Sequence, residues 1–324
     1  MSRRRSLQAR IDDYLAERRR QGFRLRSGDA FLSRFARFVA AKRHRGPLTA
    51  ELMAEWVRTA KDGNGDAGTW ARSWGRLRHF ICYLQQFEPD TEVPEASLFG
   101  PEPGRVAPHI YHDGEIVELL AAARTLGPTG SIRPFTYETL FGLMASTGLR
   151  VSEAIHLRDA DVDLKRGMLT IRQTKFAKSR QVPIHPSTVK ALACYRRQRE
   201  RHLPTIAGMP FLISSRGRRL GLPLGERQAH RVFTGLREHL GWINRGGHEA
   251  PRLHDLRHTF AVRRLMRWYA DGAEIDQKML ALATYMGHAE IFYTYWYLTG
   301  VPELMAITAG RFEQFADLAG DDDA

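Results

Sequence analysis

The chain has 324 residues, of which 43% are hydrophobic and 26% are charged. This composition is typical of a globular protein with room for two domains and a sizeable core, and it excludes global disorder. The formal net charge of +13 at pH 7 favours a polyanionic partner, with nucleic acid ahead of an acidic membrane. A basic host proteome or simple solubility would produce the same excess.

Cysteine usage and hydropathy bound the compartment. Cys82 and Cys194 lie far apart without a CxxC pattern, so neither a disulfide framework nor a zinc knuckle is expected. The basic segment 2–5, SRRR, is not followed by the apolar stretch of a signal peptide. No window approaches the ~18 uninterrupted apolar residues of a membrane span. We therefore expect a soluble, cytoplasmic protein without a membrane partner.

Residues 1–98 are predicted to form a helical domain. Apolar residues recur there at helical spacing. The recurring positions are Leu7, Ile11 and Leu15, then Phe31, Phe35 and Val39, then Leu52, Trp56 and Val57, then Leu77, Ile81 and Leu84. Residues 1–80 hold 19 Lys/Arg against 8 Asp/Glu, a net of +11. This surplus favours a DNA clamp over a merely solvated bundle.

Prolines and glycines then interrupt the helical pattern. Five prolines lie between positions 89 and 108, and segment 99–110 is predicted to be an extended linker. The second domain, 111–324, is predicted to combine helices with a short β-hairpin at 168–184. Its last helix is expected at 301–317, followed by a frayed acidic tail. The fold class is therefore mainly α with a small antiparallel β-sheet, in two domains.

Residues 147–153, TGLRVSE, place an arginine between two predicted helices. Gly148 ends the first helix, so Arg150 starts the second and Glu153 follows one turn later. A carboxylate at that spacing can hold the guanidinium in one rotamer and direct it into a cleft. The same pair on an open surface would contribute only ~0.3–0.5 kcal/mol and would indicate no function.

Lys175 and Lys178 lie at the tip of the predicted hairpin. A lysine held by a β-turn could protonate a departing oxygen, a general-acid role worth ~10²–10⁴ in rate. The ordinary alternative is a charged turn that keeps the hairpin soluble.

Residues 254–258, HDLRH, lie on a predicted helix with one buried side. His254 and Arg257 share a stripe next to the apolar one, which places both at the edge of a core. The apolar stripe consists of Leu253, Leu256 and Phe260. The spacing of His254 and His258 also suits a metal ion, but Arg257 would repel it, so we expect no metal site.

His288 follows Gly287, a helix-ending residue, and is therefore expected at a turn. Three phenols come next, at Tyr293, Tyr295 and Tyr297. Lone histidines and aromatic clusters are usually structural. Their position downstream of two arginines suited to a phosphate instead indicates that one phenol meets a phosphodiester.

In this order, the segments resemble those of the tyrosine recombinases, which include lambda-integrase-type phage integrases and Xer-like enzymes. The matching segments are 147–153, 175–180, 254–261, 286–288 and Tyr297. The resemblance covers the second domain. The basic helical first domain is similar to the family's core-binding module in composition.

The resemblance implies a phosphate grip and a nucleophile. Arg150 and Arg257 would bind the nonbridging oxygens of the scissile phosphate, and His288 would hydrogen-bond it. Tyr297 would be the nucleophile, because nine residues after the glycine–histidine pair is the family's usual spacing. The tyrosines at 293 and 295 are at other distances.

The resemblance also implies the proton transfers. Lys175, which aligns with the first lysine of the family's hairpin, would protonate the leaving 5′ oxygen, and His254 would assist. Arginines and lysines elsewhere are candidates for DNA contacts. These candidates are Arg43, Arg45, Arg72, Arg76, Lys178 and Arg180.

As a whole, the resemblance implies a C-shaped clamp that cleaves duplex DNA at a recombination site through a 3′-phosphotyrosyl link. No metal, ATP or other cofactor would be needed. The family acts as a tetramer on synapsed sites, with which accessory proteins could associate. Residues 301–317 would dock on a neighbouring subunit or fold back on their own domain. Type IB topoisomerase activity and a non-catalytic DNA-binding accessory protein are the alternatives.

One departure from the family concerns the 34-residue interval from His254 to His288, which is longer than in compact members. The extra residues are predicted near 268–277, where they should enlarge a loop between two helices without moving either histidine.

Overall fold

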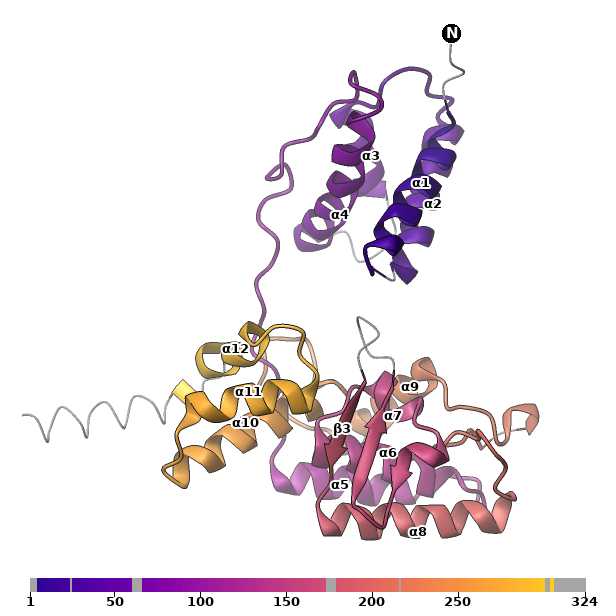
Figure 1. The fold of residues 1–324 in the computed structure, drawn as a ribbon, viewed down its shortest axis with the longest axis vertical. Coiled ribbons are helices and arrows are strands. Elements are labelled where there is room, and N and C mark those ends of the chain that lie inside the picture. Colours follow the sequence, from indigo (N-terminus) through magenta and orange to yellow (C-terminus); the bar gives the residue numbers. More distant parts are fainter. Residues whose placement is uncertain are drawn as a thin grey trace, which may run out of the picture. The chain divides into compact units, whose positions relative to one another are not determined.

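The computed structural model describes residues 5–23, 25–59, 66–172, 179–215, 217–300 and 304–305. The chain divides into two compact units, Met1–Gly104 and Arg105–Ala324, and the division lies within the segment 99–110. Figure 1 shows the helices of both units and the small sheet of the second. Among the described residues, no helix is long and apolar enough to cross a membrane.

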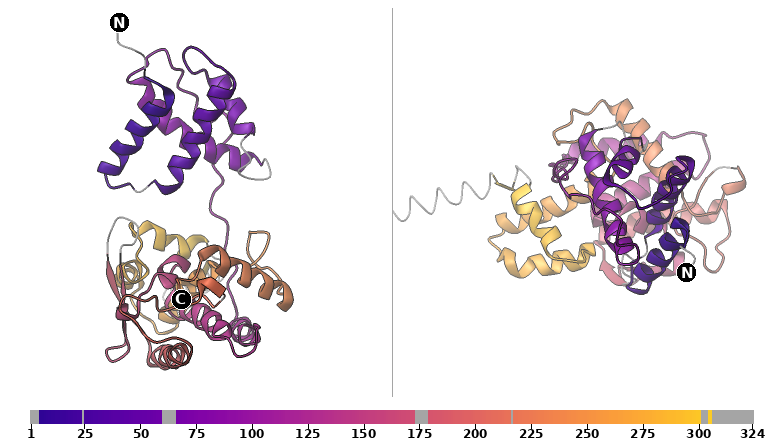
Figure 2. Two further views of the ribbon diagram at one scale, coloured as in Figure 1. Left: turned by 90° about the vertical axis from the view of Figure 1, so that its right-hand side faces the viewer. Right: turned by 90° about the horizontal axis from the view of Figure 1, so that it is seen from above.

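The first unit is helical, as the spacing of its apolar residues predicts. Its helices are α1 (Leu7–Arg20), α2 (Arg26–Ala41), α3 (Ala50–Thr59) and α4 (Ala67–Gln85), shown from further sides in Figure 2. Side-chain caps start two of them, because Ser6 accepts a hydrogen bond from the Ala9 N–H and Asp66 from that of Thr69. Their apolar faces meet in one core. Its members include Phe35, Trp56, Trp74 and Phe80.

The second unit is mainly α with a small antiparallel sheet, which confirms the predicted fold class. Its helices are α5 (Asp113–Arg124), α6 (Arg133–Thr147), α7 (Val151–Ile155), α8 (Pro186–His202), α9 (Glu226–Leu240), α10 (Asp255–Ala270), α11 (Ile275–Met286) and α12 (Phe292–Gly300). The strands are β1 (Val162–Asp163), β2 (Met168–Ile171) and β3 (Arg180–Pro183), in the order β1-β2-β3. The hairpin prediction corresponds to β2 and β3, whereas β1 was not predicted.

The junction of α6 and α7 depends on Gly148, which ends α6 with φ of 64°. A Cβ atom at this position would lie 2.5 Å from Cδ1 of Phe260, on α10. Glycine is required both for the left-handed backbone and for the close approach of α10. The packing of α6 against α10 therefore brings Arg150, at the start of α7, beside the helix that carries Arg257.

Helices α10, α11 and α12 pack around a core of their own, which includes Leu265, Met279, Leu282, Met286 and Tyr297. The prediction of an enlarged loop near 268–277 is wrong. The helix α10 continues to Ala270 and α11 begins at Ile275, so the turn is limited to Asp271–Glu274. Trp268 and Ile275, on either side of this turn, both belong to helices and pack against the same core.

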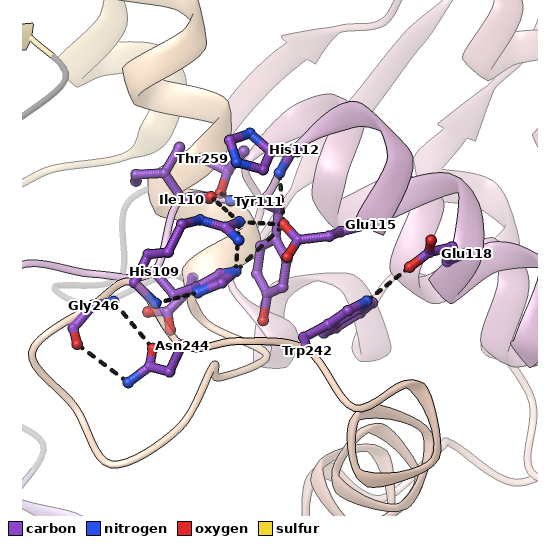
Figure 3. Close-up of polar contacts among 12 residues, drawn as sticks. His109, Ile110, Tyr111, His112, Glu115, Glu118, Trp242, Asn244, Gly246 and Thr259 are labelled. Carbon is purple, nitrogen blue, oxygen red and sulfur yellow. Dashed lines mark hydrogen bonds and ion pairs between the residues drawn. The ribbon is translucent and has the colours of Figure 1, made fainter.

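The chain that enters the second unit is fixed to α10 and to the loop after α9 (Figure 3). The Tyr111 N–H donates to Thr259 Oγ1 on α10 at 3.0 Å, and the Tyr111 hydroxyl donates to the Arg252 carbonyl at 2.9 Å. His109 Nδ1 accepts from the Arg245 N–H at 3.2 Å. These bonds hold the N-terminal end of α10, where the first site histidine lies.

We expect Gly148→Ala to lower the free energy of unfolding by about 2–4 kcal/mol, the combined cost of left-handed backbone and overpacking. Urea unfolding followed by circular dichroism measures the change. Gly142→Ala is the matched control, because its Cβ would meet only Leu120 side-chain atoms, at 3.6 Å or more. This control should gain about 0.5–1 kcal/mol as a helical alanine. Equal stabilities of the two variants would contradict the packing argument.

Candidate active site

Arg257 is the buried centre of the site, with 2% of its surface exposed. Its Nη1 donates to the Gly148 carbonyl at 2.6 Å, and its Nη2 donates to the Met286 carbonyl at 2.8 Å. Burial and the nearby Arg150 lower its pKa to about 9, which still leaves the guanidinium charged at neutral pH. Arg257 thus joins the ends of α6 and α11 to α10. It lies deeper than the core edge at which the sequence placed it.

Arg150 lies beside Arg257 at the start of α7. Its Nη1 donates to Glu153 at 2.9 Å, and its Nη2 donates to the Gly287 carbonyl at 3.2 Å. The two arginines therefore bind consecutive carbonyls at the end of α11, where the helix dipole places partial negative charge. Arg150 remains partly exposed.

Glu153 links Arg150 to a third arginine, Arg180, on β3. Nη1 and Nη2 of Arg180 donate to Oε1 and Oε2 of Glu153 at 3.0 and 2.9 Å, respectively. Burial alone would raise the pKa of Glu153, but the hydrogen bonds and charge of Arg180, with those of Arg150, lower it to about 2. Glu153 is therefore ionised at neutral pH and fixes both arginines.

His258 on α10 contacts the phenol of Tyr297, and His254, at the start of this helix, contacts His258. His254 and His258 have ring centroids 4.9 Å apart, and His258 Nδ1 lies 3.0 Å from the Tyr297 hydroxyl oxygen. Burial, with Arg257 next in effect, lowers the pKa of His254 to about 4. Burial raises the pKa of Tyr297, and Arg257 and Arg150 oppose the rise. The phenol is therefore protonated at neutral pH, and His254 is neutral.

His288 lies on the other side of Tyr297, just after the end of α11. Gly287 ends this helix with φ of 68°, as the sequence indicates. The His288 ring stacks on that of Tyr297, with centroids 6.4 Å apart and planes 21° apart. Its Nδ1 lies 2.6 Å from the hydroxyl oxygen of the buried Thr294, which fixes the ring. Burial, followed by Arg257, lowers its pKa to about 3.

The structure thus brings together most of the residues that the sequence assigns to the site. Those it brings together are Arg150, His254, Arg257, His288 and Tyr297. Lys175 and Lys178 lie outside the described residues, as does the helix predicted at 301–317 apart from Leu304 and Met305. Leu304 is buried in the core of α10–α12.

The two other tyrosines have different surroundings. The Tyr293 side chain is partly exposed and lies against the guanidinium of Arg105, with 4.7 Å between the guanidinium carbon and the ring centroid. The Tyr295 hydroxyl donates to Asp276 at 3.4 Å. Neither contact directs the phenol toward Arg257, whereas the charges of Arg257 and Arg150 act on Tyr297.

The candidate DNA contacts fall into two groups. Arg43 and Arg45 are exposed after α2, and Arg72 and Arg76 are exposed on α4 of the first unit. Arg180 is instead engaged within the second unit, since its Nε also donates to the Tyr285 carbonyl at 2.8 Å. Its guanidinium thus connects β3 to Glu153 and to the end of α11.

Three residues with site contacts were missed from the sequence. His258 was considered only as a metal ligand, although its four-residue spacing from His254 places both on one helix face. Thr294 and Arg105 gave no local signal, because their partners are reached only through the tertiary fold. No group of three or more His, Cys, Asp or Glu side chains in the described part of the chain is arranged to hold a metal ion.

We expect Glu153→Gln to destabilise the second unit by about 3–5 kcal/mol at pH 7, because it removes the buried negative charge that two arginines share. The pKa of about 2 in the folded protein lies below the ordinary glutamate value of 4.5. The stabilisation is therefore complete above pH 4.5 and is lost as the pH falls toward 2. The gap between wild type and variant should narrow over that range in urea unfolding.

Glu138→Gln is the control, since Glu138 pairs with the largely exposed Arg124 and should cost less than about 1 kcal/mol at either pH. A gap between wild type and Glu153→Gln that stays constant from pH 7 to pH 3 would refute the assigned role of the carboxylate.

The second unit matches the model of the phage integrase family over residues 110–301. A proposed integrase/recombinase of Sinorhizobium fredii, y4rB, is 37% identical over 307 residues, covering 94% of this chain and 96% of that protein. The tyrosine recombinase XerC of Rhodospirillum centenum is 30% identical over 286 residues, covering 84% of this chain and 76% of the relative.

Solved structures show the same fold at low sequence identity. The Tn1549 transposon integrase in complex with transposon right end DNA aligns with a TM-score of 0.64 at 16% identity, covering 96% of this chain and all of that one. The XerH site-specific recombinase bound to a palindromic difH substrate aligns with a TM-score of 0.62 at 17% identity, covering 88% and 78%. The family model and the sequence relatives show that this chain belongs to the phage integrase family and is a tyrosine-type site-specific recombinase.

Proposed function

We propose that this recombinase cleaves one DNA strand at a time by attack of the Tyr297 phenol on a phosphodiester, and that it rejoins strands from the resulting 3′-phosphotyrosyl link. The observation that carries the proposal is the arrangement of Arg150 and Arg257 on consecutive carbonyls at the end of α11. Each guanidinium has five N–H donors, so both retain donors for phosphate oxygens. The protonated Tyr297 lies within the electrostatic reach of both.

The proposed cleavage step exchanges one phosphoester bond for another. A bond forms between the Tyr297 oxygen and phosphorus, and the bond from phosphorus to the 5′ oxygen breaks. The neutral imidazole of His254 takes up the phenol proton, and Lys175 supplies a proton to the departing oxygen. Arg150, Arg257 and the imidazole of His288 stabilise the charge that gathers on the nonbridging oxygens.

This chemistry would need neither a divalent metal nor ATP. Fixed guanidiniums supply positive charge where a metal ion would otherwise supply it. The covalent phosphotyrosine retains the energy of the broken bond, so ligation to a new strand needs no further source. The 3′ end of the cleaved strand would stay covalently attached to the protein until ligation.

We further propose that the partner is a duplex DNA recombination site. The chain carries a net charge of +13, and the structures that resemble it include recombinases solved with bound DNA. The basic first unit would act as the core-binding clamp, with Arg43, Arg45, Arg72 and Arg76 near the phosphates. Assembly as a tetramer on synapsed sites, with residues 301–317 docking in trans, belongs to the same proposal.

Capture of the covalent intermediate tests the nucleophile. A pool of nicked duplexes of randomised sequence should trap wild-type protein as an adduct that survives denaturation, and sequencing the trapped DNA identifies the site. Tyr297→Phe should form no adduct, because the aromatic ring remains and the nucleophilic oxygen is lost. Tyr293→Phe and Tyr295→Phe are the controls and should retain the adduct. Undiminished yield with Tyr297→Phe would reject this nucleophile.

Chelation tests the source of positive charge. Adduct formation on the duplex recovered from the pool should be unchanged by excess EDTA, because the guanidiniums are part of the chain. Arg257→Lys should lower the cleavage rate at least ~100-fold under the same conditions, since lysine cannot bind carbonyls and phosphate simultaneously in a fixed plane. A strict requirement for Mg²⁺ would show that the arginines do not suffice.

A further inference from the structure

His258 makes the direct contact with the hydroxyl of Tyr297. The distance from His258 Nδ1 to the Tyr297 oxygen is 3.0 Å, within the range of a hydrogen bond. The His258 ring is enclosed by three others at edge-to-face angles, with centroids between 4.9 and 6.0 Å away. These rings belong to His254, Trp296 and Tyr297. The imidazole is therefore held in one orientation.

Both partners of this hydrogen bond are neutral, which allows the phenol to donate to the imidazole. Burial raises the pKa of the Tyr297 phenol, so the phenol keeps its proton and can donate it. Burial, followed by the neighbouring His254, lowers the pKa of His258 to about 2, so its imidazole is neutral and offers one lone pair. In the tautomer with the His258 proton on Nε2, Nδ1 accepts the Tyr297 O–H.

We propose that His258 is the positioning residue of the nucleophile, holding the Tyr297 hydroxyl at a fixed distance from the phosphate grip. The proposal rests on Tyr297 being the nucleophile. His258 follows Arg257 directly on α10, so one rigid helix carries both the residue that binds phosphate and the residue that orients the phenol. The hydrogen bond fixes the C–O–H torsion and keeps an oxygen lone pair free for phosphorus.

The other neighbours of Tyr297 act on it differently. His288 faces the flat side of the phenol ring, and its Nδ1 is engaged with Thr294. Arg257 engages the carbonyls of Gly148 and Met286. Neither contact sets the direction of the hydroxyl hydrogen, whereas the bond to His258 does.

The test compares His258→Phe, which keeps a flat ring without an acceptor, with His258→Asn, whose Oδ1 can occupy the place of Nδ1. On the nicked duplex recovered with the wild-type protein, His258→Phe should form the covalent adduct about 10–100-fold more slowly, because small misplacement of a reacting atom is costly. His258→Asn should recover most of the rate. Affinity for the intact duplex should be unchanged in both variants.

His202→Phe is the matched control, since His202 is a helical histidine of α8 with hydrogen bonds to Gln198 and Gly130 and lies outside the site. It should react at the wild-type rate. A wild-type rate in His258→Phe would overturn the proposal, and so would an equal loss in His258→Phe and His258→Asn with normal DNA affinity.

A measurement without DNA keeps this test separate from that of the proposed function. In protein labelled with ¹³C at tyrosine Cζ, the Tyr297 resonance is the one lost in Tyr297→Phe. It should shift in His258→Phe and return toward its original position in His258→Asn. An unshifted resonance in His258→Phe would overturn the positioning role even if cleavage were absent. Failure of the wild-type protein to form any adduct would instead overturn the proposed function.

Discussion

The site depends on a buried cation whose cost is met by backbone carbonyls. Arg257 is almost completely removed from water, which is unfavourable for a charge unless hydrogen bonds replace the lost hydration. The carbonyls of Gly148 and Met286 provide that replacement. Both stand at helix ends, where carbonyls have no partner within the helix. Separation of the helices α6, α10 and α11 would therefore break the hydrogen bonds that replace the hydration of this guanidinium.

This constraint explains why the two glycines are placed as they are. Gly148 and Gly287 each follow the last residue of a helix in the left-handed conformation. At Gly287 a Cβ would lie 2.5 Å from Nη1 of Arg180, so a side chain there would displace the arginine that holds Glu153. Each glycine thus ends a helix and also makes room for a neighbour of the site. The backbone turn and the charged cluster have to form together.

The sequence predicted the parts of this arrangement that depend on local spacing. The stripe of His254 and Arg257, the helix ends at positions 148 and 287, and the mainly helical fold all follow from periodicity of a few residues. The turn at 271–274 and strand β1 could not be predicted in this way. Tertiary packing determines where the helices on either side of the turn end, and pairing with β2 determines β1. The role of Arg180 depends on Glu153, 27 residues away, and that contact exists only after β3 pairs with β2.

The charges of the central cluster match the reaction better than they match the substrate. Arg150, Arg180 and Arg257 contribute three positive charges, and Glu153 contributes one negative charge, which leaves a net of +2 in this cluster. Low pKa values keep the imidazoles of His254, His258 and His288 uncharged at neutral pH. A phosphodiester carries one negative charge, whereas the pentavalent species formed by phenolate attack carries two. The attraction of a cluster with a net charge of +2 grows with the negative charge on the phosphate. In the proposed reaction, the cluster would therefore stabilise the transition state more than the bound substrate. That difference in stabilisation is what accelerates a chemical step.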